Sequence, residues 1–397
     1  MDVEVPVPWR KPLLALGGVG LVALCGMALV ASIAGRYPLF DLRVYLWGAE
    51  QVIHGRSIYS GSEPMTGAVF TYPPFAAVFF VPLALIGGKA AAILWATASI
   101  AALCRVSWLL AAASGLRPVP VVGAALLGVA AFLEPTTTTL LWGQINIILL
   151  WLVAEDRIGA MPRRSRGICT GVAAGLKLTP ALFILNLLTT RQWRDGLRAV
   201  AATGVTLLIG AAVAPASTWS YFTGALRDTS RVAEGDSIMH PGNQSLDGTL
   251  WRLLGPGGNI GIWLAGLAVV GVIALVAARR FDAHGLAVEQ MSVVGLAMVL
   301  VAPVSWTHHY VWALPALCVL ARRALADRDR VAAGLLIGAL VILASNFSKW
   351  AISFGEEVPW ILRQVAWDPY VIMALVLLAY FWMLARKVAA PSPKIDA

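Results

Sequence analysis

Long apolar runs, separated by short polar stretches, cover most of this 397-residue chain. An α-helix needs about 20 apolar residues to cross the hydrocarbon core of a bilayer, and somewhat fewer when its ends are polar. The first run, 12–34, is too long for the apolar part of an ordinary signal peptide, so we expect an uncleaved first span. Nine further runs have the character of spans: 90–113, 119–134, 140–155, 197–215, 259–278, 288–304, 309–322, 331–346 and 366–386.

Two more apolar stretches, 74–87 and 168–188, do not fit as simple crossings. If 74–87 crossed, the arginine-rich segment 156–167 would face the side opposite to the other basic loops. If 168–188 crossed, the basic run 191–194 would lie across the membrane from the similarly basic 163–166. The sequence therefore predicts ten crossings and two segments that dip into the membrane or lie flat on it, with twelve crossings as the alternative.

Prolines predict a break in each of these two stretches. The first opens with Pro73 and Pro74, and the second contains Pro180 shortly after Lys177. Proline lacks the N–H that a helix interior needs, and its ring clashes with the preceding turn. Broken backbone at membrane depth must be covered by protein or line a water-filled cavity.

The composition agrees with a membrane protein. The chain is 59% hydrophobic and only 13% charged, with a mean hydropathy of +0.77, whereas a soluble domain carries about 25% charged residues. The apolar runs are too numerous for one buried core, and no polar stretch is long enough for a separate soluble domain. We expect an all-α polytopic membrane protein in which residues 1–397 form a single domain of about 10–12 hydrophobic helices.

The net charge of +9 suggests a nucleic-acid partner only until its distribution is considered. Of the 30 lysines and arginines, 20 fall on one side of the expected spans and nine on the other, with Lys177 inside an apolar stretch. Such an excess is the positive-inside pattern, which orients a membrane protein. It places 35–88, 215–258, 305–309 and 347–366 on the non-cytoplasmic side, and no nucleic-acid partner is expected.

All four cysteines lie in apolar runs, and none forms a CxxC pair: Cys25, Cys104, Cys169 and Cys318. We expect them to fill space as small apolar residues. The outer loops are therefore predicted to lack a disulfide framework.

The two longest polar stretches both lie on the predicted outer side. In 35–73, apolar residues recur at helical spacing between positions 42 and 53, which predicts an amphipathic helix on the membrane surface. The stretch 216–258 is too long and too polar for a simple connector, and loops of this kind are often binding loops or lids. We expect 35–88 and 216–258 to form the roof of a site on that side.

Asp41 is the first candidate for catalysis. It follows the first span by only about seven residues and lies between Phe40 and Leu42. A carboxylate among apolar neighbours at the lip of a membrane is costly, because desolvation disfavours its charge. Two interpretations are open: Asp41 is the base of a membrane enzyme, or it caps a surface helix that starts at Leu42.

His308 and His309 are adjacent at the outer end of an expected span. One imidazole could bind or protonate a phosphate oxygen, whereas the alternative is that both pack with Trp306 and Trp312 at the membrane interface. No CxxC or HExxH spacing accompanies them, so a zinc site is not expected.

Further polar residues lie where polarity is costly or useful. Lys177 is deep in an apolar stretch, where it either snorkels towards the cytoplasmic edge or lines a cavity. Gln144 and Asn146, at the outer start of a span, suit sugar hydroxyls and hydrogen bonds between helices equally well. Outer arginines such as Arg43 could take a phosphate in bidentate fashion, or pair with acidic neighbours on the surface.

The order and spacing of these motifs resemble a known family. The motifs are Asp41-Leu-Arg-Val-Tyr45, Gly55-Arg-Ser-Ile-Tyr59, Tyr72-Pro-Pro-Phe75, Gly143-Gln-Ile-Asn146, Lys177-Leu-Thr-Pro180, Asn243-Gln-Ser245 and Ser305-Trp-Thr-His-His309. Over about residues 10–385, the chain resembles the polyprenol-phosphate-mannose-dependent α-1,2-mannosyltransferases, integral-membrane glycosyltransferases of the GT-C fold. The members that extend phosphatidylinositol mannosides resemble it most, and the lipomannan-branching members are the alternative.

This resemblance implies a catalytic aspartate in the first outer loop, and Asp41 occupies that place. It also implies a polyprenyl-phosphate-mannose donor and a phosphatidylinositol mannoside acceptor, which meet at the periplasmic face of the plasma membrane. No metal or other cofactor is expected, because phosphate is already a fair leaving group and basic side chains can stabilise its charge. The substrate-binding candidates are His308, His309, Arg43, Tyr45, Gln144, Asn146, Lys177, Asn243, Gln244, His240 and Tyr72.

A lipid or glycolipid transporter is the alternative from a different class, since broken apolar segments and an intramembrane lysine occur there too. Transporters usually have internal repeats and polar residues at the membrane midplane. Here the polar residues cluster outside the spans and no repeat is convincing, which favours the enzyme. We expect the protein to be a monomer.

Overall fold

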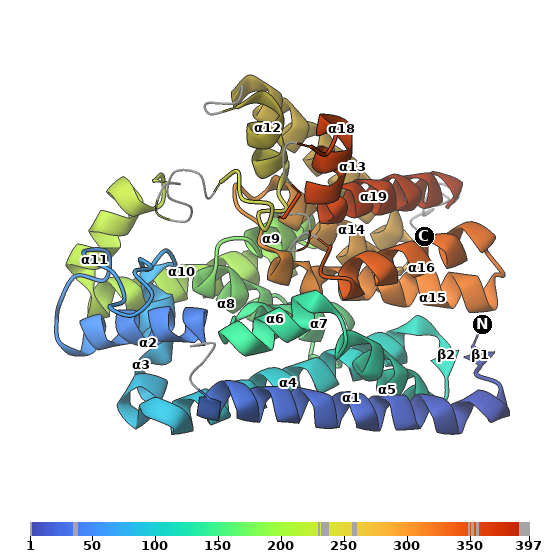
Figure 1. Ribbon diagram of the computed structural model, residues 1–397, viewed down its shortest axis with the longest axis horizontal. Coiled ribbons are helices and arrows are strands. Elements are labelled where there is room, and N and C mark those ends of the chain that lie inside the picture. The colour runs from blue at the N-terminus through green and yellow to red at the C-terminus, as the bar shows by residue number, and fades with distance from the viewer. Residues whose placement is uncertain are drawn as a thin grey trace, which may run out of the picture.

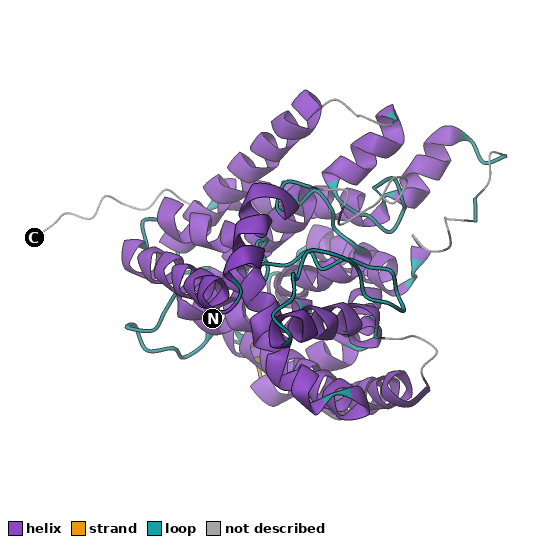
Figure 2. Cartoon of the chain, turned by 90° about the vertical axis from the view of Figure 1, so that its left-hand side faces the viewer, coloured by secondary structure: helices purple, strands orange, loops and turns teal. Residues whose placement is uncertain are grey.

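The computed structural model describes residues 2–34, 39–228, 231, 238–255, 260–347, 350, 353–354 and 357–388. Nearly all regular structure in these residues is helical, as the apolar pattern predicts (Figures 1 and 2). Two short parallel strands, β1 (Val3–Glu4) and β2 (Leu116–Arg117), pair near the N-terminus. They lie at the end of the molecule opposite to α2 (Phe40–Ile53), because the long helix α1 (Val7–Ala34) separates them (Figure 1).

The helices alternate between long spans and short segments. After α1 and α2, the first half contains α3 (Pro74–Ile86), α4 (Gly88–Ser114), α5 (Val119–Ala130), α6 (Glu134–Trp142), α7 (Asn146–Ile158), α8 (Ile168–Leu176), α9 (Ala181–Thr189) and α10 (Trp193–Val213). The second half contains α11 (Pro215–Ser220), the π-helix η1 (Tyr221–Ala225), α12 (Leu246–Leu254), α13 (Ile260–Ala283), α14 (Ala287–Val301), the 3₁₀-helix η4 (Thr307–Ala313), α15 (Leu314–Ala326), α16 (Arg330–Ala344), α18 (Trp360–Trp367) and α19 (Pro369–Lys387).

Five helices among the described residues are long and apolar enough to cross a membrane: α1, α4, α10, α13 and α19. The pair α5 and α6 meets the same test together, although the two are bent by 72°. Three shorter apolar helices, α3, α14 and α16, also fall in the predicted apolar runs. A multi-pass helical membrane protein is confirmed, and the number of ten crossings stays a prediction.

Some predicted spans are interrupted for local reasons. The run 119–134 stops at Ala130, and α6 then starts at Glu134, next to a proline in its first turn. The run 140–155 is divided because Gly143, with a φ of +69°, ends α6 in the left-handed conformation. Glycine adopts this conformation at no steric cost, so it commonly ends helices.

The two stretches that did not fit as crossings are short or broken. The 13-residue helix α3 begins at Pro74, where proline fits the first turn, and it ends before Gly87. The stretch 168–188 divides into α8 and α9, and Lys177 between them has an extended backbone. The break predicted at Lys177–Pro180 is confirmed, whereas 74–86 forms one continuous helix that begins at the predicted proline pair.

Small residues allow the helices to pack closely around this arrangement. A Cβ added at Gly128 of α5 would lie 2.6–2.7 Å from atoms of Leu16 of α1. A Cβ added at Gly48 of α2 would lie 2.5 Å from the ring of Phe70. The close approach of α5 to α1 at Gly128 is typical of helix packing in membranes. All four cysteines are described, and none forms a disulfide.

The amphipathic helix predicted for residues 42–53 is confirmed as α2. Its buried face carries Leu42, Tyr45 and Ala49, whereas Glu50 is exposed. The helix packs against α3 and contacts α6. It therefore presents its first turn to the residues that follow α6.

Candidate active site

The first turn of α2 places Asp41 on the wall of a cavity of about 580 Å³. The N-terminal capping position of α2 is Leu39, so the prediction that Asp41 caps a helix starting at Leu42 is wrong. Asp41 is instead the second residue of the helix, where the helix dipole favours a negative charge. One of its carboxylate oxygens, Oδ2, is enclosed and has no hydrogen-bond partner in the described part of the chain.

Burial changes the proton affinity of this group. It raises the pKa of Asp41 to about 7, and the hydrogen bond to Gln144 and the positive charge of Lys177 oppose part of this rise. A carboxyl group with a pKa near neutrality can accept a proton during a reaction and release it afterwards, as a general base requires.

Gln144 reaches the site because Gly143 turns the chain sharply after α6. A Cβ on Gly143 would lie 2.6 Å from the Cβ of Leu42, so this turn packs directly against α2. The Oε1 of Gln144 accepts hydrogen bonds from the hydroxyl of Tyr45 at 3.0 Å and from Nδ2 of Asn146 at 3.3 Å. The amide of Gln144 therefore has a fixed orientation beside Asp41.

Lys177 joins this network from the break between α8 and α9. Its Nζ donates to Oδ1 of Asn146 at 3.1 Å and lies 3.0 Å from Nε2 of His309. The contact with His309 fits a hydrogen bond from an ammonium group to a neutral imidazole. Lys177 also lies over the ring of Tyr72, 5.5 Å from its centroid, which is a cation–π geometry.

The two histidines both line the cavity, so η4 does not turn one of them away. Their ring centroids are 4.8 Å apart, and the ring of His308 lies 5.6 Å from that of Trp142. The 3₁₀-helix begins at Thr307, next to the extended residue Trp306. Asp41, Lys177 and the histidine pair thus meet from three distant parts of the sequence.

Glu134 holds this histidine segment in place, and the sequence analysis did not single it out. It is buried at the start of α6, and its Oε1 accepts hydrogen bonds from the hydroxyls of Thr307 at 2.7 Å and Thr138 at 2.8 Å. Its Oε2 accepts a hydrogen bond from Tyr370 at 2.7 Å. The available signal was an acidic residue at the end of an apolar run, where an ionisable group is costly.

Arg231 and Asp228 bring further charges to the cavity from the outer loop 216–258. The Nη2 of Arg231 donates to the backbone carbonyl of Tyr59 at 2.9 Å, and its guanidinium lies over the ring of the same residue. The predicted roof is therefore in contact with the first loop at this point. Parts of 216–258, namely 229–230, 232–237 and 256–258, lie outside the described residues.

Other predicted residues lie behind the cavity wall or away from it. Tyr45 and Asn146 support Gln144 from behind, whereas Arg43 lines a separate cavity on the other side of α2. Asn243 and Gln244 bind the backbone of Ser305: Asn243 Oδ1 accepts from its N–H at 2.9 Å, and the Gln244 N–H donates to its carbonyl at 2.6 Å. Their direct contact with substrate stays a prediction.

His240 is exposed, and its Nδ1 accepts a hydrogen bond from the backbone N–H of Gly242 at 2.9 Å. It packs its ring against Trp306, which lines the cavity. Its substrate-binding role also stays a prediction.

No group of three or more metal-ligating side chains occurs in the part of the chain that the structure describes. An Asp-x-Asp pair, which is typical of metal-dependent nucleotide-sugar enzymes, is present at Asp327 and Asp329. Asp329 caps α16 by accepting from two backbone N–H groups, and it also contacts Arg323. Asp327 forms an ion pair with Arg323, and neither aspartate lines the cavity of Asp41.

Comparisons with known proteins now give the class of this protein. The model of glycosyltransferase family 87 matches residues 70–303, and the chain belongs to this family. It is a glycosyltransferase enzyme, and the predicted fold class, a helical membrane glycosyltransferase of the GT-C type, is confirmed. No solved structure matches the chain.

Individual relatives are similar along nearly the whole chain. A polyprenol-phosphate-mannose-dependent α-(1-2)-phosphatidylinositol mannoside mannosyltransferase of Mycobacterium tuberculosis is 30% identical over 93% of this chain and 93% of that protein. Two enzymes named for phosphatidylinositol pentamannoside are also similar. The one from Mycobacterium tuberculosis is 32% identical over 87% of this chain and 81% of its own length. The one from Mycolicibacterium smegmatis is 30% identical over 96% of this chain and 93% of its own length.

Proposed function

We propose that this protein is an inverting α-1,2-mannosyltransferase that moves mannose from polyprenyl-phosphate-mannose to a phosphatidylinositol mannoside. The names of the relatives support the donor and the acceptor class. The observation that carries the catalytic assignment is the enclosed Asp41 oxygen that lacks a hydrogen-bond partner in the described chain. Asp41 lines a cavity that Lys177, His308 and His309 also line.

The reaction needs one base. The 2-hydroxyl oxygen of the acceptor mannose forms a bond to C1 of the donor mannose, while the bond from C1 to the phosphate oxygen breaks. The proton of the hydroxyl goes to Asp41, and polyprenyl phosphate leaves with the electron pair. A single displacement inverts a β-mannosyl phosphate to an α-mannoside, whereas a retaining mechanism would need a second carboxylate about 5 Å away as nucleophile.

Basic side chains can stabilise the departing phosphate. Lys177 supplies a fixed positive charge at the cavity wall, and the neighbouring imidazoles can donate hydrogen bonds. Arg231 adds a guanidinium from the outer loop. Preorganised donors in a partly enclosed site are worth more than in water, because they need no rearrangement as charge develops.

The site lies next to the lipid phase, which suits two substrates with lipid tails. Asp41 follows α1 closely, and the cavity wall includes Tyr72 and Pro73, which directly precede α3, an apolar helix too short to be a simple span. The positive-inside distribution of lysines and arginines supports a location of this end on the periplasmic side of the plasma membrane. An outer-face site would have no access to cytosolic nucleotide sugars, which is consistent with a lipid-linked donor.

The proposal is tested with the purified protein, polyprenyl-phosphate-mannose and a panel of defined acceptors, followed by mass spectrometry of the products. The expected result is the addition of a single α-1,2-linked hexose to a phosphatidylinositol mannoside. Transfer to lipomannan alone would redirect the acceptor assignment to branching. The proposal would be rejected if folded wild-type protein transferred no mannose from the lipid-linked donor to any mannoside acceptor.

A further inference from the structure

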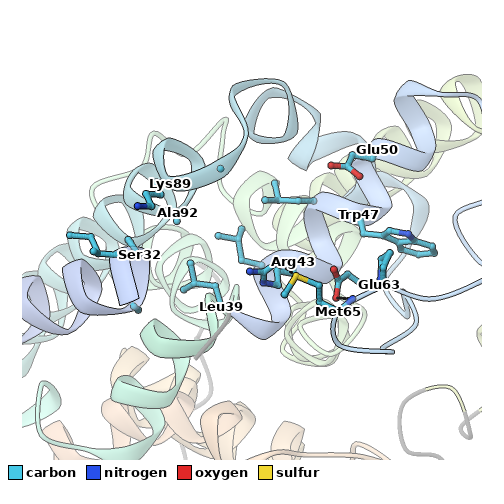
Figure 3. A pocket seen from close by; sticks show the side chains of 15 residues that line it. Ser32, Leu39, Arg43, Trp47, Glu50, Glu63, Met65, Lys89 and Ala92 are labelled. Atoms are coloured by element: carbon cyan, nitrogen blue, oxygen red, sulfur yellow. Dashed lines mark hydrogen bonds between the residues drawn. The ribbon is translucent and has the colours of Figure 1, made fainter. Parts of the chain in front are cut away.

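A second cavity of about 560 Å³ lies on the side of α2 that faces away from Asp41, and it shares no lining residue with the first. It is bounded by the last turn of α1, by α2, by the loop 63–65 and by the start of α4 (Figure 3). Nothing in the proposed transfer reaction uses this cavity.

Two cations and an apolar wall define its chemistry. Arg43 comes from α2 and Lys89 from the first turn of α4, and neither forms an ion pair within the described residues. The Nη1 of Arg43 donates a hydrogen bond to the sulfur atom of Met65 at 3.0 Å. Sulfur is a weak acceptor. Leucine side chains from α2 and from the residue that caps it form the wall beside them: Leu39, Leu42 and Leu46.

The two acidic residues of the cavity do not neutralise these cations. Glu63 is buried and uses Oε2 to accept the backbone N–H groups of Met65 and Thr66 at 3.1 and 2.7 Å. Glu50 is exposed at the edge. In Figure 3 both carboxylates lie on the side of Arg43 that is away from Lys89.

The position of the cavity connects it to the lipid phase. It lies where two candidate spans, α1 and α4, end and begin on the same side of the molecule. Apolar side chains beside it are exposed: Ile33 at 57%, Leu85 at 71% and Ile93 at 46%. Ile33 and Ile93 are on the candidate spans α1 and α4, and exposed apolar residues on spanning helices face hydrocarbon. We therefore expect the cavity to open at the boundary between lipid tails and headgroups.

We propose that this cavity binds an anionic phospholipid of the surrounding membrane. Its phosphate lies between Arg43 and Lys89, and part of one acyl chain packs against the leucines of α2. Guanidinium and ammonium groups pair well with phosphate, and basic residues at a membrane surface attract anionic lipids. The donor phosphate is not the occupant, because it must lie one bond from the sugar carbon that reacts beside Asp41, in the other cavity.

Such a lipid supports α2 from behind. Asp41 and Arg43 lie two residues apart on this helix, so a headgroup held by Arg43 restrains the turn that carries the catalytic carboxylate. The test measures binding and does not depend on the transfer reaction being the one proposed above.

Native mass spectrometry of the purified protein with added phosphatidylglycerol or phosphatidylcholine gives a direct readout. Wild type is expected to retain phosphatidylglycerol in preference to phosphatidylcholine. In the double variant Arg43→Gln, Lys89→Gln, the affinity for phosphatidylglycerol is expected to fall about 10-fold or more, since two phosphate-binding cations are removed. Arg56→Gln removes an exposed arginine of the same loop that lines neither cavity, and it is expected to bind like wild type.

The proposal would be overturned by equal retention of the two lipids by wild type, by the same preference in the double variant, or by an equal loss of binding in Arg56→Gln. Displacement of phosphatidylglycerol from wild type by polyprenyl phosphate would assign the cavity to the donor and overturn it as well. Thermal unfolding of each variant without lipid separates a binding defect from a folding defect.

Discussion

The Asp41 carboxyl group combines two properties that a general base needs, an oxygen without a competing hydrogen bond and a raised pKa. Its neighbours tune the second property in opposite directions, because burial favours the protonated form and Lys177 favours the ionised form. The reactive species is the carboxylate, so the charge on Lys177 controls how much of it exists at a given pH.

This tuning predicts the pH dependence of transfer. Below a pH of about 7 Asp41 is protonated in the free protein, so kcat/KM is expected to fall about 10-fold per pH unit, and it should reach a plateau above that pH. In Lys177→Gln the charge that lowers the pKa of Asp41 is lost, so the midpoint should move to higher pH in addition to any fall in kcat. A midpoint that is unchanged in the variant, or activity that rises as the pH falls below 7, would contradict this account.

Helical geometry also explains why Arg43 was misplaced in the sequence-based prediction of the site. At about 100° per residue, Arg43 lies about 200° around α2 from Asp41, whereas Tyr45 lies only about 40° away. The structure places Tyr45 behind the cavity of Asp41 and Arg43 in the other cavity. The helical spacing alone would have predicted that Arg43 and Asp41 lie on opposite sides of α2. Arg43 was chosen as a substrate-binding candidate because of its charge.

At the scale of elements, local chemistry predicted much of what was found. The amphipathic pattern of α2, the prolines at the start of α3 and the Lys177–Pro180 break all act within a few residues. The contacts of Lys177 with His309 and of Glu134 with Tyr370 join residues more than 100 positions apart. Such contacts depend on how helices pack, which hydrophobic periodicity does not specify.

Glu134 is expected to act on the reaction through η4. In Glu134→Gln, a side chain that can donate through its amide replaces one that accepts three hydroxyl hydrogen bonds, so Thr307 and the histidines after it lose their anchor. We expect kcat to fall about 10-fold, which corresponds to about 1.4 kcal/mol, with little change in the pH midpoint.

The matched control for this variant is Glu155→Gln, which removes a carboxylate paired with Arg105 far from the cavity. It should lower thermal stability without lowering kcat of the folded protein. If both variants reduce kcat equally, Glu134 has no specific positioning role.

Tyr370→Phe removes one of the three hydroxyl groups that donate to Glu134. We expect it to lower kcat as well, but by less than Glu134→Gln.

Gly143 ends α6 and turns the chain so that Gln144 reaches the site. Gly143→Ala introduces a Cβ 2.6 Å from that of Leu42 at a backbone φ of +69°, which disfavours any side chain. A loss of about 1–3 kcal/mol in the free energy of unfolding is expected. Gly18→Ala, whose Cβ would have no atom within 4 Å, should be tolerated. Comparable denaturation curves for the two variants would contradict the close packing of α2 on this turn.

For the whole molecule, the distribution of charge predicts orientation. The strand pair β1–β2 and the first loop occupy opposite ends of α1, so they should lie on opposite sides of the membrane (Figure 1). Exposed positions are available on each side, Ser60 in the first loop and Arg164 in the basic loop after α7.

Composition predicted the multi-pass helical class, because a chain with 59% hydrophobic residues cannot bury all of them in one soluble core.

This orientation is checked by cysteine labelling in intact cells, in a background from which the four native cysteines have been removed. A membrane-impermeant maleimide is expected to label Ser60→Cys and to leave Arg164→Cys unlabelled until the cells are opened. The reverse pattern would place the cavity of Asp41 on the cytoplasmic side and remove the argument for a lipid-linked donor.

The most direct test of the central claim is the turnover of purified Asp41→Asn with polyprenyl-phosphate-mannose and a phosphatidylinositol mannoside. Asparagine keeps the shape of the side chain but cannot accept the proton, so kcat is expected to fall by about 10²–10⁴-fold while the protein inserts, purifies and unfolds at a temperature close to that of wild type. Turnover similar to that of the wild type would contradict the assignment of Asp41 as the base.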